Sequence, residues 1–288
     1  MANKSFRIGL DIGGTKIAAV LLNENNKVVD HLVLATPKDS LNHLLIMLQA
    51  AIDPLLERLE KSKNSLLGIG IGVPGSVDQI KEQVIAASNL PLINKIKLSS
   101  LLSQQIKRPD ISYILDNDAK CFVRAEAVLG AGKHSSNFYG LTIGTGIGGG
   151  WWHDGDIHRG FHGTAGGPGH MIVDIDKLIT LEQAYHTLMQ NNPALMAEEA
   201  YHGDRLAEQR FQEIGSYLGI AFSTIVRLID PEIIVLGGGA LAASELFLNA
   251  AKASMKKSVS PYQSSSVKLV KSKVGPLAGA IGAALLIK

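Results

Sequence analysis

The sequence predicts an α/β fold, in which helices form layers on β-sheets. Runs of apolar and β-branched residues of strand length alternate along the chain with longer segments of helical period. Two pairs of these strands are separated only by short glycine-rich turns, at residues 13–15 and 144–146, which indicates two hairpins. A chain of 288 residues that is 46% hydrophobic is long enough to bury a sizeable core.

The first part of the chain opens with a hairpin, which Gly13, Gly14 and Thr15 close as its turn. Strands are predicted for residues 6–11, 17–22, 67–73 and 111–115. Residues 41–61 have a helical pattern, which we expect Pro54 to interrupt because proline has no N–H to donate inside a helix.

The second part repeats the opening hairpin and continues with alternating strands and helices. Strands are predicted for residues 138–143, 147–152 and 232–236. Helices are predicted for residues 118–130, 204–228, 240–257 and 276–288. We expect an N-terminal α/β lobe of residues 1–117, with the final helix 276–288 packed on it, and a C-terminal α/β lobe of residues 118–275.

Composition excludes several classes of protein. The formal charge is only +2 and no basic block occurs, so nucleic acid is not an expected partner. No apolar stretch reaches the ~20 residues of a membrane-spanning helix, and no signal peptide is seen, so we expect a cytoplasmic protein without a membrane partner. Cys121 is the one cysteine, which excludes an internal disulfide and a zinc site built from several thiolates.

The first glycine-rich turn has the residues of a phosphate site. Backbone N–H groups can approach phosphates where glycines remove the side chains, and Gly13 and Gly14 provide this. The Thr15 hydroxyl and the Lys16 charge would add phosphate contacts, and the Asp11 carboxylate would hold Mg²⁺ through water. An ordinary tight hairpin, with Asp11 as a turn residue, is the alternative.

The second turn makes the phosphate interpretation stronger. Residues 142–150 repeat the design, with Thr145 and Gly146 at the turn, and two such turns facing one another across a cleft would clamp the phosphates of a nucleotide. The glycine spacing at 70–75 and 144–149 also matches the dinucleotide-binding fingerprint, but neither segment lies between a strand and a helix. The GxxxxGK phosphate loop is absent from the sequence.

Eight segments, in order along nearly the whole chain, together resemble the ROK family of bacterial-type glucokinases, N-acetylhexosamine kinases and related repressors. They are LDIGGTKIAAVLL, GIGVPGSVD, ASNLP, DNDAKCFVRAE, TIGTGIGGG, GHMIVD, DPEIIVLGGGAL and GPLAGAIGAALL. The resemblance implies an actin-like (ribonuclease H-like) ATPase fold, with two α/β lobes around a nucleotide and sugar cleft. It also implies ATP and Mg²⁺ as cofactors, a small-molecule sugar as substrate, and a homodimer.

The implied activity is the ATP-dependent phosphorylation of a hexose or N-acetylhexosamine at O6, as in a glucokinase. N-acetylmannosamine or N-acetylglucosamine kinase activity is an alternative. A sugar-sensing protein without catalysis is an alternative of another class, whereas a repressor would need a DNA-binding domain ahead of the hairpin that begins by Ile8. ATP is the expected donor, and polyphosphate is worth testing beside it.

The resemblance assigns roles to individual residues. Asp118 corresponds to the aspartate that takes the proton from the sugar hydroxyl, and Asn117 and Asn89 match positions that bind sugar hydroxyls, with Gly75 beside them. Judged from its place between a strand and a helix, Asp118 could equally be a helix cap. The loop of Gly237, Gly238 and Gly239 resembles the family's adenosine-side loop, or is a close-packed strand-to-helix turn.

The segment from residue 165 to 185 departs from the family pattern. Gly167 stands where the AGExGH motif has a glutamate that contacts the sugar, so one sugar ligand is missing. No cysteines follow His170, so no structural zinc is expected, and His170 is either a sugar ligand or a structural histidine. Glu182 matches a second glutamate of the family that contacts sugar, with a helix-start carboxylate as the alternative.

Overall fold

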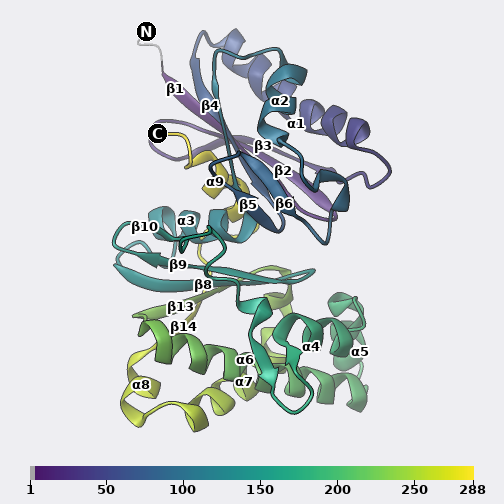
Figure 1. Ribbon diagram of the computed structural model, residues 1–288, viewed down its shortest axis with the longest axis vertical. Helices are drawn as coiled ribbons and strands as arrows, with labels where there is room; N and C mark the ends of the chain where they lie inside the picture. The colour runs from purple at the N-terminus through teal and green to yellow at the C-terminus, as the bar shows by residue number, and fades with distance from the viewer. Residues whose placement is uncertain (1–3) are drawn as a thin grey trace. The chain divides into compact units, whose positions relative to one another are not determined.

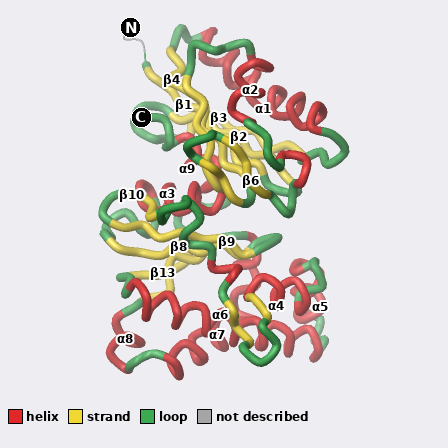
Figure 2. Tube along the Cα trace, in the orientation of Figure 1, coloured by secondary structure: helices red, strands yellow, loops and turns green. Residues whose placement is uncertain are grey.

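The computed structural model describes residues 4–288, which form two compact units. Unit 1 contains the chain up to Ala125, the short segment Arg159–Ala165 and the C-terminal segment Val274–Lys288. Unit 2 contains Glu126–His158 and Gly166–Lys273. Each unit has its own five-stranded sheet with helices packed on it (Figures 1 and 2).

The sheet of unit 1 has the strand order β3-β2-β1-β4-β7. Its members are β1 (Ser5–Ile12), β2 (Lys16–Leu22), β3 (Val28–Ala35), β4 (Ser65–Val73) and β7 (Ser112–Asn117). The predicted opening hairpin is confirmed, since β1 and β2 pair antiparallel, and β4 and β7 run parallel to β1. The edge strand β3, which alternates between partly buried and exposed residues, was not predicted.

The helices of unit 1 cover both faces of this sheet. On one face, Ile8, Leu10 and Ile12 share a core with apolar residues of α1 (Leu41–Lys61). On the other face, β1 presents Gly9 and Asp11 to α9 (Ala278–Ala284), as the period of two along a strand requires. A Cβ atom on Gly9 would lie 1.9 Å from the Ala280 carbonyl oxygen, so only glycine allows α9 to pack this closely.

Two helix predictions in unit 1 were wrong in detail. The helix α1 continues through Pro54 without a break, because buried leucines and isoleucines on both sides of the exposed proline hold the two halves in one helix. The final helix is shorter than the predicted residues 276–288 at both ends. It begins late because residues 275–277 form a turn that closes with the Ala278 N–H donating to the Gly275 carbonyl. It ends at Ala284 because the N–H groups of Leu286 and Ile287 donate to carbonyls only three residues back. Unit 1 also contains α2 (Leu98–Ile106), the 3₁₀ turn η1 (Pro91–Ile93) and the small hairpin of β5 (Ser76–Asp78) and β6 (Gln83–Ala86).

The sheet of unit 2 has the strand order β10-β9-β8-β13-β14. Its members are β8 (Asn137–Ile143), β9 (Ile147–His153), β10 (Asp156–His158), β13 (Ile233–Gly237) and β14 (Lys268–Lys271). The second predicted hairpin is confirmed by the antiparallel pairing of β8 and β9. The strand β13 runs parallel to β8, so both strands end at the same edge of the sheet.

The helices of unit 2 include the long α6 (Arg205–Ile229), which matches the helix predicted for residues 204–228 and is capped by Asp204, and α7 (Ser244–Ser258) packed against it. The predicted helix 240–257 begins late, since Gly239–Ala243 form a 3₁₀ turn, η3, that follows the left-handed Gly238.

Smaller elements complete the unit: α4 (Leu181–Leu188), α5 (Pro193–Tyr201), α8 (Pro261–Ser266), η2 (Pro168–His170), β11 (Ile172–Asp174) and β12 (Ile179–Thr180). Helix α3 (Asp118–Leu129) contains the boundary between the units. Among residues 4–288, no helix combines the length and hydrophobicity that crossing a membrane requires.

Candidate active site

The carboxyl ends of three parallel strands of unit 1 gather the acidic residues of the candidate site. Asp11 on β1 pairs in register with Gly72 on β4, and Gly72 pairs with Asp116 on β7. The chain then passes through Asn117 into α3, which begins at Asp118. Asp11 and Asp118 therefore lie at one edge of the sheet, where α/β proteins commonly bind their ligands.

Asn117 caps the N-terminus of α3. Its side-chain oxygen accepts from the Lys120 N–H at 3.0 Å, which is the contact of a helix cap. The Asp118 carboxylate instead accepts from the Ala119 N–H at 2.8 Å and from the Asn117 amide at 3.0 Å, all through one oxygen, Oδ1. The cap that was the alternative role for Asp118 is therefore provided by its neighbour.

The electrostatics of this edge favour protonated carboxyl groups. Burial, and then the nearby Asp11 charge, raise the pKa of Asp118 to about 7. Burial likewise raises the pKa of Asp11 to about 6, although Lys16 opposes that shift. A carboxylate with a pKa near neutrality is suited to accept a proton from a substrate hydroxyl.

The first glycine-rich turn is held next to Asn89. The Gly13 N–H donates to the Lys16 carbonyl at 2.9 Å, and a Cβ atom on Gly14 would lie 3.3 Å from the Asn89 carbonyl oxygen. Neither glycine has a positive φ, so their value here is the close approach of backbone and not a left-handed turn. Thr15 and Lys16 are exposed at the turn.

Gly75 and Asn117 are joined directly. The Asn117 side-chain amide donates to the Gly75 carbonyl at 2.8 Å, so the amide bridges Gly75 and Asp118. Gly75 has a φ of +86°, and a Cβ atom on it would lie 1.9 Å from the Ala86 carbonyl oxygen. A side chain at this position is excluded by both the backbone conformation and the space.

The second glycine-rich turn, in unit 2, lies beside the loop after β13. A Cβ atom on Gly238 would lie 2.2 Å from the carbonyl oxygen of Ile143, the last residue of β8. The candidate nucleotide residues Thr145 and Gly146 therefore share one sheet edge with Gly237, Gly238 and Gly239. The buried Tyr185 of α4 donates its hydroxyl to the Gly144 carbonyl at 2.9 Å and so holds this turn in place.

His170 and Glu182 belong to neighbouring elements of unit 2. A Cβ atom on Gly169, the residue before His170, would lie 3.0 Å from a carboxylate oxygen of Glu182. Glu182 also lies 3.6 Å from His186 one turn along α4. A Cβ atom on Gly167 would lie 3.6 Å from the His170 side chain, which is an ordinary contact. Position 167, where the family motif has a glutamate, therefore has room for a Cβ atom.

Three residues at these sites were not found from the sequence. Gly279 of α9 packs on Asp11, because a Cβ atom there would lie 2.3 Å from the Asp11 carboxylate. Tyr185 holds the second turn, and Arg159 pairs with Asp116 next to Asn117. Each acts across the fold on a partner far away in sequence, so no local pattern marks it.

The acidic edge fits a divalent cation. Two partly buried carboxylates with raised pKa values, Asp11 and Asp118, form a negative site whose repulsion a bound Mg²⁺ would relieve. Oxygen ligands of this kind are those that Mg²⁺ prefers. Within the described part of the chain, no three histidine, cysteine, aspartate or glutamate side chains are grouped as a metal site.

Comparison with known proteins agrees with this architecture. Residues 7–288 match the ROK family. A glucokinase of Halalkalibacterium halodurans is 28% identical over 98% of this chain and 94% of its own length. An N-acetylgalactosamine kinase of Shewanella sp. is also 28% identical, over 96% of this chain and 95% of its own. A xylose repressor of Bacillus spizizenii is 27% identical over 98% of this chain and 77% of its own.

A solved structure shares the fold as well. The ROK family glucokinase of Streptomyces griseus, crystallised with glucose and AMPPNP, superposes with a TM-score of 0.81 at 25% identity. The match covers 98% of this chain and 99% of that one. The predicted actin-like α/β fold is thereby confirmed, and the chain belongs to the ROK family, with the fold of its sugar kinases.

Proposed function

We propose that this sugar kinase transfers the γ-phosphoryl group of ATP to O6 of a hexose or N-acetylhexosamine. One observation carries the proposal: the Asp118 carboxyl has its pKa raised to about 7 and is relieved of helix capping by Asn117. Such a group can take a proton at neutral pH. The glycine-rich turn of the same unit would supply backbone N–H groups of the kind that bind phosphate.

In the proposed reaction, Asp118 accepts the proton of the sugar hydroxyl as the oxygen attacks the γ-phosphorus and ADP leaves with its electron pair. Asn117 orients Asp118 through its side-chain amide and, with Gly75 and Asn89, forms the sugar side. Asp11 would hold Mg²⁺ through water, and the ion would neutralise phosphate charge. Catalysis of this type consists mainly of positioning and charge stabilisation, which these fixed groups provide.

The relatives support the sugar class without choosing one sugar. Proteins named for glucose and for N-acetylgalactosamine are equally similar to this chain, at 28% identity. Gly167 removes one expected ligand, while His170 and Glu182 remain as candidates. We therefore propose a hexose or N-acetylhexosamine, with N-acetylmannosamine and N-acetylglucosamine included. Homodimer formation and a cytoplasmic location stay predictions.

A sugar sensor without catalysis is the second candidate. It is favoured by Gly167, which lacks the carboxylate of the family motif, and by the similarity to a xylose repressor. The retained Asp11, Thr15, Asp118 and Thr145 favour the enzyme, because a sensor needs no base.

A substrate panel distinguishes the two candidates. Purified protein with Mg²⁺ is given hexoses and N-acetylhexosamines, with ATP and separately with polyphosphate, and ADP and sugar phosphate are measured. We expect ATP-dependent formation of a sugar 6-phosphate from at least one member. Sugar binding in calorimetry without phosphate transfer from either donor would instead establish the sensor.

A further inference from the structure

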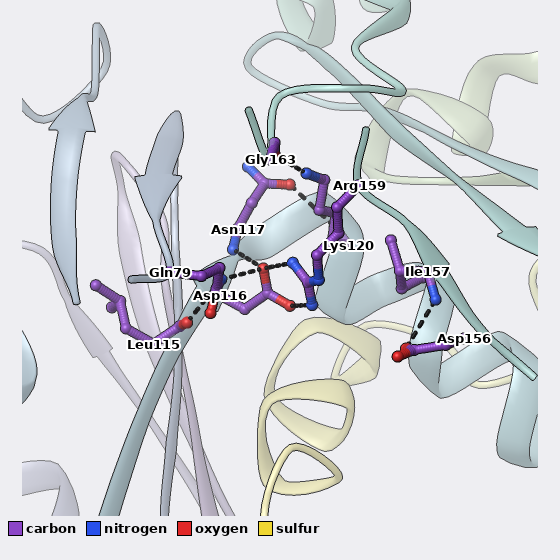
Figure 3. Close-up of polar contacts among 9 residues, drawn as sticks. All are labelled: Gln79, Leu115, Asp116, Asn117, Lys120, Asp156, Ile157, Arg159 and Gly163. Atoms are coloured by element: carbon purple, nitrogen blue, oxygen red, sulfur yellow. Dashed lines mark hydrogen bonds and ion pairs between the residues drawn. The ribbon is translucent and has the colours of Figure 1, made fainter. Parts of the chain in front are cut away.

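The short segment Arg159–Ala165 belongs to unit 1, although the chain on both sides of it belongs to unit 2. We call it the strap. Two glycines allow its backbone to turn, since Gly160 and Gly163 have φ angles of +68° and +76°, which other residues rarely adopt. Figure 3 shows its two anchors, Arg159 and Gly163, beside the residues around Asn117. The strap is therefore attached to unit 1 by specific contacts.

The first anchor is a buried ion pair. Arg159 Nη1 donates to Asp116 Oδ1 at 2.8 Å and Nη2 donates to Oδ2 at 2.7 Å, while the Asp116 side chain is only 1% exposed (Figure 3). Gln79 Nε2 donates to the same Oδ1 at 3.1 Å. The planar guanidinium matches both carboxylate oxygens, so the pair fixes orientation as well as charge.

The second anchor is on α3. The buried Lys120 donates its ammonium to the Gly163 carbonyl, and its backbone N–H donates to Asn117. A Cβ atom on Gly163 would lie 3.7 Å from the Val77 carbonyl oxygen, so the strap backbone also lies next to β5. The strap therefore borders both the start of α3 and the strand that follows Gly75.

One carboxylate connects the strap to the proposed base. Asp116 Oδ1, which Arg159 contacts, also accepts from the Asn117 backbone N–H at 2.8 Å. The Asn117 side chain in turn bonds Gly75 and Asp118. A rotation of the Asp116 carboxylate would shift Asn117, and Asn117 orients the oxygen of Asp118.

We infer that Arg159 is a positioning residue for the sugar side of the site, acting through Asp116 on Asn117 and Asp118 and holding the strap beside Gly75. The inference rests on the proposed function. A displacement of about 1 Å at such a site costs on the order of 100-fold in rate. The ATP side does not depend on this anchor, because the glycine-rich turn has its own hydrogen bonds: the Gly13 N–H donates to the Lys16 carbonyl, and Thr36 donates to the carbonyls of Gly13 and Thr15.

The test compares Arg159→Gln and Arg159→Lys with the wild type. We expect Arg159→Gln to lower kcat/KM for the sugar by about 10- to 100-fold while the Kd for AMPPNP changes less than about twofold. Arg159→Lys keeps the charge without the fork and is expected to recover only part of the loss. Arg108→Gln is the matched control, because Arg108 forms a bidentate pair with Asp110 at 2.8 Å on the exposed surface of the same unit.

The double variant Asp116→Asn with Arg159→Gln separates positioning from folding. Arg159→Gln alone leaves the buried Asp116 carboxylate without its guanidinium partner and should lower the midpoint of urea unfolding. The double variant removes that charge, so we expect its midpoint to return toward the wild-type value while kcat/KM for the sugar stays low. Recovery of both together, or an equal loss of sugar and AMPPNP binding in Arg159→Gln, would overturn the inference. If the wild type binds sugar without transferring phosphate, the proposed function fails alone, and the sugar Kd of the same variants tests Arg159.

Discussion

At the residue scale, the stability of the fold and the proposed activity of Asp118 favour opposite protonation states of its carboxyl group. Its pKa of about 7 lies above the ordinary value of 3.8, so the folded protein favours the protonated form. The folded state therefore binds more protons than the unfolded state between about pH 4 and pH 7, and its stability falls as the pH rises through that window. The proposed base has to be ionised, which is the state that destabilises the fold.

Asp118→Asn is expected to raise the free energy of unfolding, with a gain that grows from pH 4 to pH 7 and is constant above. The reason is that asparagine keeps the shape of the protonated acid but cannot ionise inside the partly buried site. Urea unfolding at pH 5 and pH 8 measures the gain. An equal gain at both pH values would show that the pKa of Asp118 is not raised.

Gly167→Glu tests the missing sugar ligand. The space beside His170 accepts a side chain, and a charged hydrogen bond to a sugar hydroxyl contributes about 1.5–3 kcal/mol, so we expect the sugar KM to fall by roughly 10-fold or more. Thr187→Glu, which adds the same charge at an exposed position of α4, is the control. A KM that rises or stays constant would mean that the sugar does not reach this position.

Residue roles could be predicted from the sequence only where a motif carries them. The sequence motifs placed Asp11, Asn117 and Asp118 close together, and the structure brings them to one sheet edge. Local patterns could not show that Asn117 is the cap, because Asn117 and Asp118 are both good capping residues. The partnership of Asp116 with Arg159, 43 residues away, has no local signal either.

At the element scale, hairpins and long helices were predictable and the short pieces were not. The strands around both glycine-rich turns are apolar runs of strand length, and the helix α6 has a clear apolar period near 3.6 residues. The edge strand β3 alternates between partly buried and exposed residues, but both sets are mostly apolar, so its sequence shows no alternation. The helices α4 and α5 are only 8 and 9 residues long, too short for a helical period to stand out in the sequence. Pro54 misled the prediction of α1, since tertiary packing outweighed its local preference.

Pro54→Ala is expected to stabilise the protein by about 1–2 kcal/mol. Proline disfavours a helix interior by about 3 kcal/mol relative to alanine, and the greater freedom of alanine in the unfolded chain cancels part of the gain. Pro54 is exposed, so no core contact is lost. Urea unfolding measures the change, and Glu57→Ala, an exposed site on the same helix, is the control. A loss of stability would mean that the ring contributes packing.

At the scale of the whole molecule, the chain builds two cores and passes between them more than once. One core gathers around β1, α1 and β4, and the other around β8, α6 and α7. Unit 1 includes the strap and the C-terminal segment, both far in sequence from its main part. The packing of the final helix on the first lobe was expected from the sequence, whereas the strap was not, because no linker composition marks the places where the chain passes from one unit to the other.

The central claim is that Asp118 is the base of an ATP-dependent sugar kinase, and the kinetics of Asp118→Asn test it most directly. With the sugar found by the substrate panel, we expect kcat to fall roughly 10²- to 10⁴-fold while the Kd for AMPPNP in calorimetry stays near the wild-type value. Asp110→Asn, at an exposed carboxylate of the same unit, is the control and should retain full activity. A kcat of Asp118→Asn equal to that of the wild type would contradict the claim.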